Sequence, residues 1–371
     1  MPEQNELRLR DIERARRAVM LEQRSSTDVL IDRWYERSWI ERSWRRCLSQ
    51  GRLPGERVQF DMVPAQALRR AEEASHALLQ VARPVMSQLS RAIAGSSYFA
   101  VLTDAQGTVV GVDGAIDRSD RRASLITRIG VDLSERAVGT TAIGAALAEL
   151  QPVWLHRGEH FFDDTSCYSC AGAPLIGPDG RAVGMLDVTG IDAAERPELK
   201  HMVVQSARSI EDALALAQPH ALLLRLNWPG RTFGTEHEGL LCLDKDGWVA
   251  SANPAARDML GQLPAGDAPT HASELFACAW EDLFNAARKD EAVEVPLWSG
   301  LTLQVLAQVA GRTLGSRPAA PDTRMPLRDL EAELIHQAVR DARGNVMAAA
   351  KMLGISRATV YRKLGKRLPP P

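Results

Sequence analysis

The chain has 371 residues, of which 45% are hydrophobic and 25% charged, and its formal net charge is -2. This length suits two or three domains, and the composition is that of globular proteins, which excludes disordered and collagen-like chains. No stretch approaches the ~18 apolar residues of a membrane-spanning helix, and residues 1–17 lack the apolar core and cleavage site of an export signal. Five cysteines, an odd number, favour a reducing compartment over a disulfide framework. We therefore expect a cytoplasmic protein with no membrane partner.

The charges are unevenly distributed along the chain. Residues 326–371 carry nine Lys and Arg against four Asp and Glu, whereas residues 53–325 carry 24 against 34. Within residues 344–371 there are six basic side chains and no acidic one. A basic tail on an acidic body predicts an anionic partner at the C-terminal end, although a solvated helix end would carry the same charges.

The N-terminal region, residues 1–60, is expected to be mostly helical. Its tryptophans, Trp34, Trp39 and Trp44, are spaced by five residues, and this spacing drifts around a helix of 3.6 residues per turn. We therefore expect these side chains to pack at different seams rather than to form one ligand-binding box. No functional site is assigned to this region.

Residues 61–218 are predicted to form an α+β domain of the size of a small-molecule sensor. Turn residues, such as those of Pro178-Asp179-Gly180, separate its apolar runs. In chain order the expected elements are a helix over 64–94, strands over 98–103 and 108–112, a helix over 137–150, strands over 152–155, 173–176 and 182–188, and a closing helix over 197–216. Helices are thus expected to flank an antiparallel sheet.

A smaller α+β unit is predicted over residues 235–310, after a break near residues 219–234. Its expected elements are strands over 239–243 and 248–251, a helix that ends at residue 260, and strands over 291–297 and 302–308. Residues 311–326 are rich in Gly and Pro and have no apolar periodicity, which predicts a linker. The expected fold class is multidomain α+β with a separate all-α tail.

The tail, residues 327–371, is predicted to be helical. Its expected helices cover residues 327–341, 346–353 and 357–364. Gly354 can stop the second helix, and Ser356 can cap the third. Two short helices joined in this way form a helix-turn-helix, whose second helix lies in the major groove of DNA.

DNA contacts follow from this geometry. Arg357 and Thr359 are base-edge candidates at the start of the recognition helix, and Arg362, Lys363 and Lys366 suit phosphates. The tail resembles the Fis-type DNA-binding domain of bacterial enhancer-binding regulators over about 45 residues. The motifs that carry this resemblance are Gly344-Asn345-Val346, Ala348-Ala349-Ala350, Leu353-Gly354-Ile355-Ser356-Arg357 and Thr359-Val360-Tyr361-Arg362-Lys363-Leu364. The resemblance implies a module that binds double-stranded DNA as a homodimer. A helical bundle with a basic surface is the alternative.

A second resemblance covers residues 30–215, which are similar to the GAF sensor region of acetoin-catabolism-type regulators. The motifs that carry it are Ser43-Trp44-Arg45-Arg46-Cys47, Leu102-Thr103-Asp104, Gly139-Thr140-Thr141-Ala142-Ile143-Gly144, Glu159-His160-Phe161 and Gly184-Met185-Leu186-Asp187-Val188-Thr189-Gly190. Residues 239–256 resemble a PAS domain. Together these resemblances imply a transcription regulator that senses a small-molecule effector.

The expected effector pocket lies where residues 139–144 open a helix beside the sheet. The hydroxyls of Thr140 and Thr141 can face a cavity that Phe161 closes, with His160 and Cys170 as polar lining. Such a pocket suits a small, partly polar organic molecule.

No phosphate-binding loop of the form Gly-x4-Gly-Lys-[Ser/Thr] occurs in the 371 residues. The roughly 100 residues between the sensor and the linker are also too few for a nucleotide-hydrolysing motor beside a PAS-like unit. We therefore expect no ATP-dependent activation of sigma-54 polymerase. We also expect no enzymatic activity and no cofactor, and RNA polymerase is a candidate partner.

Three alternatives remain at this stage. His156, His160, Cys167 and Cys170 are of the types that form tetrahedral zinc sites, but their spacing matches no zinc-ribbon pattern, so we expect His160 in a pocket and Cys170 as a small buried hydrophobe. A GAF fold with nearby cysteines could instead be a thiol-dependent enzyme that reduces sulfoxides. The chain could also pair with a full-length sigma-54 activator and antagonise it.

Overall fold

The computed structural model describes residues 2–22, 38–234, 237–261, 263–266, 268–289, 291–310, 346–347 and 350. Residues up to Ala310 form one compact unit, and those from Gly311 onward form another. The predicted DNA-contact residues, 356–366, and the whole predicted linker lie outside the described residues. Within the described ranges, no helix is long and apolar enough to cross a membrane.

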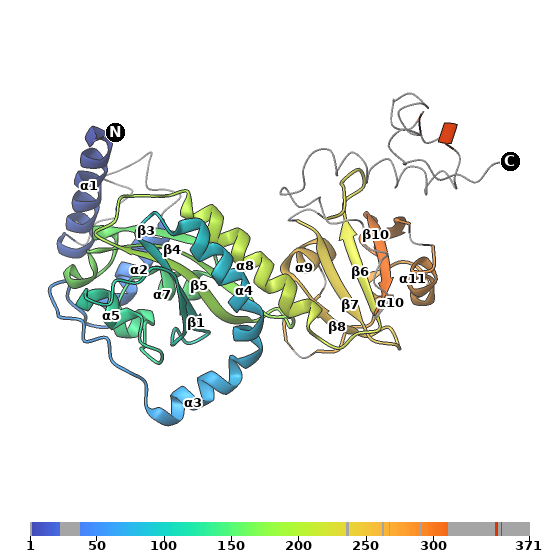
Figure 1. The fold of residues 1–371 in the computed structure, drawn as a ribbon, viewed down its shortest axis with the longest axis horizontal. Coiled ribbons are helices and arrows are strands. Elements are labelled where there is room, and N and C mark those ends of the chain that lie inside the picture. Colours follow the sequence, from blue (N-terminus) through green and yellow to red (C-terminus); the bar gives the residue numbers. More distant parts are fainter. Residues whose placement is uncertain are drawn as a thin grey trace, which may run out of the picture. The chain divides into compact units, whose positions relative to one another are not determined.

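The first domain is built on a five-stranded antiparallel sheet of strand order β2-β1-β5-β4-β3 (Figure 1). The strands are β1 (Tyr98–Asp104), β2 (Val109–Asp113), β3 (Val153–His156), β4 (Tyr168–Ile176) and β5 (Ala182–Ile191). On one face, Ala100 and Leu102 of β1 pack with α4 (His76–Ile93) and α8 (Leu199–Leu216). Phe99 and Val101 pack on the opposite face, because successive side chains of a strand alternate in direction. Both faces are covered, which explains why every residue of the strand is buried.

Short helices and the N-terminal region cover the second face of this sheet. The elements are α1 (Pro2–Arg16), which continues as a π-helical turn η1 (Arg17–Leu21), then α2 (Ser38–Ser49), α5 (Arg121–Ile126), α6 (Glu135–Val138) and α7 (Ala142–Glu149). Trp39 and Trp44 of α2 are both buried in one apolar cluster with these elements. They pack in the core, as predicted, but they share a cluster instead of occupying different seams; Trp34 lies outside the described residues.

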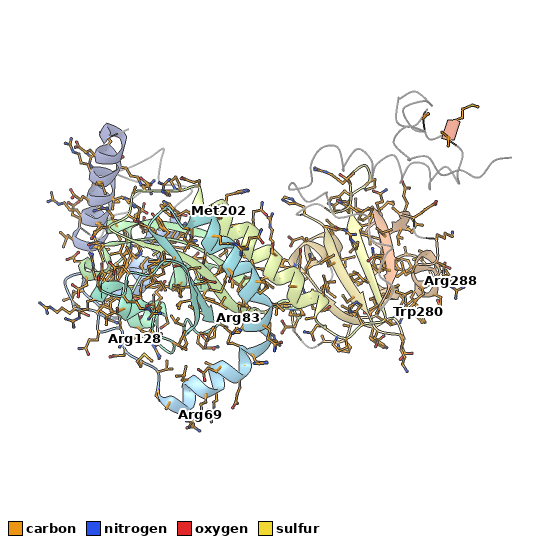
Figure 2. The ribbon with its side chains drawn as sticks, in the orientation of Figure 1. Arg69, Arg83, Arg128, Met202, Trp280 and Arg288 are labelled. Atoms are coloured by element: carbon orange, nitrogen blue, oxygen red, sulfur yellow. The ribbon has the colours of Figure 1, made fainter. Side chains whose placement is uncertain are left out.

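Two predicted helices are each divided in the structure. The helix expected over residues 64–94 is broken at Ser75 into α3 (Ala65–Ala74) and α4, and α3 has no buried residue. Arg69 of α3 accordingly points away from the sheet (Figure 2). The helix expected over residues 137–150 is divided at Gly139, whose φ of 69° is unfavourable for other residues. A Cβ at Gly139 would also lie 2.7 Å from the Phe162 ring, so this turn packs closely against the neighbouring loop.

The second sheet has the strand order β8-β7-β6-β10-β9 and is also antiparallel. Its strands are β6 (Leu222–Asn227), β7 (Gly239–Leu243), β8 (Val249–Ala252), β9 (Val293–Pro296) and β10 (Thr302–Val309). Its helices are α9 (Pro254–Leu260), α10 (Ala272–Leu275) and α11 (Trp280–Ala286). These elements share one apolar core. The mixed helix-and-sheet class expected for the chain is confirmed for the described residues.

The central strand of this second sheet was missed by the sequence pattern. A break was expected near residues 219–234, and the smaller unit was expected to begin at residue 235. In the structure β6 occupies 222–227 and pairs with both β7 and β10. This strand ends at the turn residues Asn227, Pro229 and Gly230. The strand was missed because the alternation of buried leucines before them, Leu222, Leu224 and Leu226, is short and the turn signal beside it is strong.

Candidate functional site

The loop between β3 and β4 carries His160 and is held by the N-terminal helices. The loop contains two short 3-10 turns, η4 (Arg157–Glu159) and η5 (Asp163–Thr165). The guanidinium of Arg16, on α1, donates hydrogen bonds to the carbonyl oxygens of Gly158, His160 and Phe161 and forms an ion pair with Asp163. These bonds connect α1 directly to the backbone that positions His160.

A second N-terminal helix holds the same loop from within the core. The indole N–H of Trp44, on α2, donates to the carbonyl oxygen of Glu159 at 2.9 Å, and the Trp44 side chain is fully buried. The Glu159 carboxylate accepts hydrogen bonds from Arg8 on α1 and from the backbone N–H of His156. The position of His160 therefore depends on residues more than 100 positions away in the sequence.

A small cavity of about 30 Å³, lined almost entirely by buried residues, lies between this loop, α7 and the sheet. Its lining surface is mostly apolar, but seven of the side chains that line it, counting the Cys170 thiol, carry hydrogen-bonding groups. The lining residues are Phe60, Val101, Ile126, Leu133, Val138, Thr141, Ala142, Ile143, His160, Thr165, Tyr168, Cys170, Asp187 and Thr189. This cavity is the candidate effector site.

Three of the five predicted pocket residues line this cavity. Thr141, His160 and Cys170 do so, and the Thr141 hydroxyl oxygen also caps α7 by accepting from the N–H of Gly144. Thr140 does not: its hydroxyl lies 2.7 Å from the Ser43 hydroxyl on α2.

The fifth predicted pocket residue, Phe161, is also outside the cavity lining. Its ring packs edge-on against Phe162, with the ring centroids 4.9 Å apart. Adjacent loop residues point in different directions, so the side chain next to His160 belongs to the core between the loop and Gly139. Phe161 therefore packs in the core under the loop and does not line the cavity.

His160 is neutral in this site. Burial lowers the pKa of His160 to about 4, and the nearby Arg16 charge acts in the same direction. Nδ1 lies 2.9 Å from the Arg157 carbonyl oxygen, which can only accept, so the proton is assigned to Nδ1. Nε2 then accepts, and it lies 3.6 Å from the Cys170 thiol.

Cys170 is a protonated thiol under ordinary conditions. Burial raises the pKa of Cys170 well above its usual value, and the carboxyl of Asp187 acts in the same direction. Thiol chemistry requires the thiolate, so this environment disfavours a nucleophilic cysteine. The environment of Cys170 therefore gives no support to the thiol-dependent enzyme.

Asp187 is the polar cavity residue that the sequence prediction missed. It lies on β5, is fully buried, and accepts a hydrogen bond on Oδ2 from the Thr189 hydroxyl. Its Oδ1 atom has no hydrogen-bond partner in the part of the chain that the structure describes. Burial raises the pKa of Asp187 to about 7. The available signal was a lone carboxylate within the apolar run Gly184-Met185-Leu186-Asp187-Val188.

The four residues considered for zinc do not converge on one point. His156 Nδ1 lies 2.8 Å from the Ser169 hydroxyl, and the Cys167 thiol donates to the Asp164 carbonyl oxygen at 3.7 Å. Across the described ranges, no three His, Cys, Asp or Glu side chains are grouped so that they could hold a metal ion.

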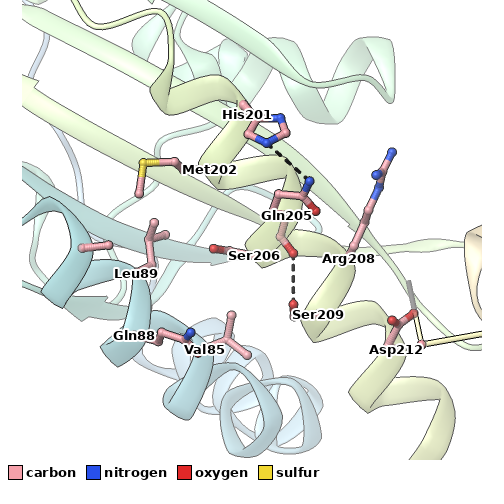
Figure 3. A pocket seen from close by; sticks show the side chains of 12 residues that line it. Val85, Gln88, Leu89, His201, Met202, Gln205, Ser206, Arg208, Ser209 and Asp212 are labelled. Atoms are coloured by element: carbon pink, nitrogen blue, oxygen red, sulfur yellow. Dashed lines mark hydrogen bonds between the residues drawn. The ribbon is translucent and has the colours of Figure 1, made fainter. Parts of the chain in front are cut away.

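A larger open cleft of about 500 Å³ lies between α4 and α8, away from this cavity (Figure 3). Val85 and Leu89 of α4 face Met202 and Ser206 of α8 across it. Several of its polar side chains bond along α8 itself, as the Ser209 hydroxyl does to the Gln205 carbonyl oxygen at 3.1 Å. The residues that line the small cavity are almost all buried and several of them are polar, so we assign the candidate effector site to that cavity.

The comparisons with known proteins match both ends of the chain. Residues 11–212, more than half of the chain, match the family described as MimR, N-terminal domain. The chain belongs to this family. Residues 326–366 match the Fis family of bacterial regulatory proteins, which confirms the resemblance expected for the tail. We call residues 11–212 the MimR-type domain.

Several relatives of this MimR-type chain are described as transcription regulators. It is 33% identical over 272 residues to the acetoin catabolism regulatory protein of Cupriavidus necator, covering 71% of this chain and 40% of the relative. It is 26% identical to the acetoin dehydrogenase operon transcriptional activator AcoR of Bacillus subtilis, covering 62% and 38%. It is 30% identical to the propane 2-monooxygenase operon transcriptional activator MimR of Mycolicibacterium smegmatis, covering 48% and 30%. The chain spans about two fifths of the length of the first two.

Among solved structures, the chain is similar to one described as the E. coli DhaR(N)-DhaL complex. The match covers 73% of this chain and 99% of that chain, with 14% identity and a TM-score of 0.44.

Proposed function

We propose that this chain is a DNA-binding transcription regulator whose MimR-type domain senses a small molecule. The observation that carries the proposal is the combination of two family matches in one chain, MimR-type at residues 11–212 and Fis-type at residues 326–366. Relatives of the chain are described as transcriptional activators or regulatory proteins. A sensor and a DNA-binding module in one chain would let an effector control DNA binding directly.

The sensing part of the proposal rests on the cavity in the MimR-type domain. Its lining residues are almost all buried, and they combine apolar side chains with polar groups, as small-molecule sites do. We assign the GAF-type sensor to residues 61–218 after a helical region 1–60, and a PAS-like unit that ends at residue 310. A linker, 311–326, would then join them to the DNA-binding tail, 327–371.

The DNA-binding part of the proposal assigns contacts on the recognition helix. Ser356 caps the helix, Arg357 and Thr359 contact base edges, and the phosphate contacts are made by Arg362, Lys363 and Lys366. Two tails of a homodimer would bind the two halves of a pseudo-palindromic site. Effector binding would shift the populations of two dimer arrangements and so change the response of RNA polymerase at the promoter.

Arg357→Ala is expected to weaken binding to the specific site by roughly 1–3 kcal/mol, because a base-edge contact is lost. Genomic footprinting with the purified chain would first identify that site. Dissociation constants would then be measured on this site and on a random duplex at several salt concentrations. The loss should be smaller on the random duplex, since base readout contributes little to nonspecific binding.

Lys366→Ala serves as the matched control for this experiment. A phosphate contact contributes equally to all sequences, so the variant should lose affinity alike on both duplexes. Its plot of log affinity against log salt should be less steep by about 0.9, because one neutralised phosphate contributes about that much to the slope. Equal losses on both duplexes for Arg357→Ala as well would contradict the assignment of base readout to Arg357.

These 371 residues are expected to hydrolyse no ATP above background and to open no sigma-54 promoter complex. The reason is that the sequence has no phosphate-binding loop, whose backbone amides and Lys would hold the nucleotide. Phosphate release from the purified chain, with and without target DNA, measures this directly. Turnover that disappears on mutation of this chain would contradict the prediction.

A further inference from the structure

A molecule can fill the candidate cavity only if part of the cavity wall moves. Almost all of the lining residues are buried, and the space of about 30 Å³ between them has room for about two water molecules. Folded proteins open locally, and they do so first in the segments that are held least firmly. The entrance is therefore expected where the wall is attached most weakly.

One part of the wall is a single side chain on an irregular segment. Residues 50–64 connect α2 to α3 (Figure 1), and Phe60 is the only buried residue among them. Its ring lines the cavity and packs edge-on against Tyr168, with the ring centroids 6.4 Å apart. Most of the other lining residues lie on helices or strands, which are held by their own backbone hydrogen bonds. The Phe60 segment is thus the weakest part of the wall.

The backbone of Phe60 is strained in this arrangement. Its φ of 52° lies in the left-handed region, which is unfavourable for a bulky side chain. Such strain persists only where the surrounding contacts outweigh it. These contacts are the burial of the ring and a hydrogen bond from the Arg128 guanidinium to the Phe60 carbonyl oxygen. The Arg128 side chain lies at the protein surface (Figure 2), where water can replace this bond.

Hydrogen bonds fix the segment on both sides of Phe60. Before it, the N–H of Val58 donates to the Asp164 carboxylate at 3.1 Å. After it, the carbonyl oxygen of Asp61 accepts from the N–H of Asp132 at 2.9 Å. These two bonds limit the movement to the residues between them, so Phe60 can swing without release of the rest of the segment.

We propose that Phe60 is the gate of the cavity. In the closed state the ring is buried and the backbone is left-handed, and in the open state the backbone is extended and the ring is turned out to solvent. Burial of the ring favours the closed state, whereas relief of the strain favours the open state. Arg128 is a positioning residue that holds the closed state. This proposal rests on the sensor function proposed above and adds the route by which a ligand enters.

The Cys170 thiol reports the opening, because it lines the cavity and is buried. The full chain would be treated with excess N-ethylmaleimide for increasing times, and tandem mass spectrometry would give the modification rate of each cysteine. Cys47 is the internal reference, since it is buried in the same domain but lies on α2, outside the cavity lining. We expect Cys170 to react about tenfold faster than Cys47 or more, because modification of Cys47 requires a larger opening.

Arg128→Ala should raise the rate of Cys170 modification about three- to tenfold and leave that of Cys47 unchanged. The variant removes the hydrogen bond to the Phe60 carbonyl oxygen but no side chain that lines the cavity. Arg69→Ala is the matched control, because Arg69 is also an exposed arginine but lies on α3, away from the cavity lining. This control should leave both rates unchanged.

Phe60→Gly removes the gate itself. Glycine adopts the left-handed backbone without strain, so the segment keeps its path while the ring is lost. The rate of Cys170 modification should rise by about tenfold to a hundredfold, the range for the burial of one large apolar side chain. Met62→Ala is the control from the same segment: the Met62 side chain is 43% exposed and lies outside the lining, so the rate should not change.

Equal rates for Cys170 and Cys47 in the native chain would overturn the gate, because the domain would then open as a whole. So would an Arg128→Ala variant in which Cys170 reacts no faster, or in which both cysteines react faster together. A Phe60→Gly chain that keeps its circular dichroism spectrum and still protects Cys170 would place the entrance elsewhere; if this variant does not fold, the Arg128→Ala rates decide. These rates involve neither effector nor DNA, so DNA binding of the same preparations tests the regulator function separately.

Discussion

Trp44→Ala is expected to lower the free energy of unfolding of the MimR-type domain by about 3–5 kcal/mol, the range for a large aromatic side chain removed from a core. The Trp44 side chain is fully buried among the apolar residues of the second face of the sheet. The variant also removes the indole N–H that bonds the Glu159 carbonyl oxygen. Chemical denaturation followed by circular dichroism would measure the loss.

Two other tryptophan variants make this result interpretable. Trp44→Phe keeps most of the apolar volume but loses the hydrogen bond, so its loss should be smaller than that of Trp44→Ala. Trp248→Ala removes a side chain that is 42% exposed, and we expect a loss below about 1 kcal/mol. Similar losses for Trp44→Ala and Trp248→Ala would show that α2 does not contribute to the core of the domain.

Asp187→Asn is expected to gain stability relative to the wild type as the pH rises from about 4 to about 7. The pKa of Asp187 is about 7 in the folded protein, whereas an unfolded Asp has a pKa of about 3.9. Between these values the unfolded chain has lost the proton and the folded chain keeps it, so wild-type stability falls with rising pH. Each unit is worth about 1.4 kcal/mol, so the difference should reach a few kcal/mol.

Stability curves of both proteins at pH 4, 5, 6, 7 and 8 test this prediction. Comparison with the variant is necessary because other buried groups titrate in the same range. Burial raises the pKa of Glu211 to about 7, which acts in the same direction, and lowers that of His160 to about 4, which acts in the opposite direction. A stability difference that does not change with pH would mean that Asp187 ionises normally in the folded protein.

Local sequence patterns predicted most elements of the first sheet because both of its faces are covered. A strand such as β1 is then a continuous apolar run between turn residues, and β5 follows a Pro-Asp-Gly turn. The same logic failed at β6, where the alternation of buried leucines is short and the turn residues that follow it dominate the local signal. Helix ends were also misplaced at Ser75 and Gly139, because packing against the neighbouring chain decides where these helices stop.

The candidate site depended more strongly on tertiary structure. Side chains at positions 140 and 161 are adjacent to true lining residues, Thr141 and His160, and a local pattern cannot say which neighbour faces the cavity. Asp187 was missed because a single carboxylate in a strand is equally compatible with an exposed position. Only the pairing of β5 with β1 and β4 places it inside.

The sequence by itself determined the family of this protein and the positions of its motifs along the chain. It could do so because capping, turn and recognition-helix signals involve residues that are close together in the sequence. The tertiary structure decided which polar groups share a cavity and how the His160 loop is held. Arg16 and Trp44 reach that loop from helices more than 100 residues earlier, and the burial that shifts the pKa values of His160 and Asp187 comes from the assembled core. Burial is a property of the packed domain, so no local pattern in the sequence encodes it.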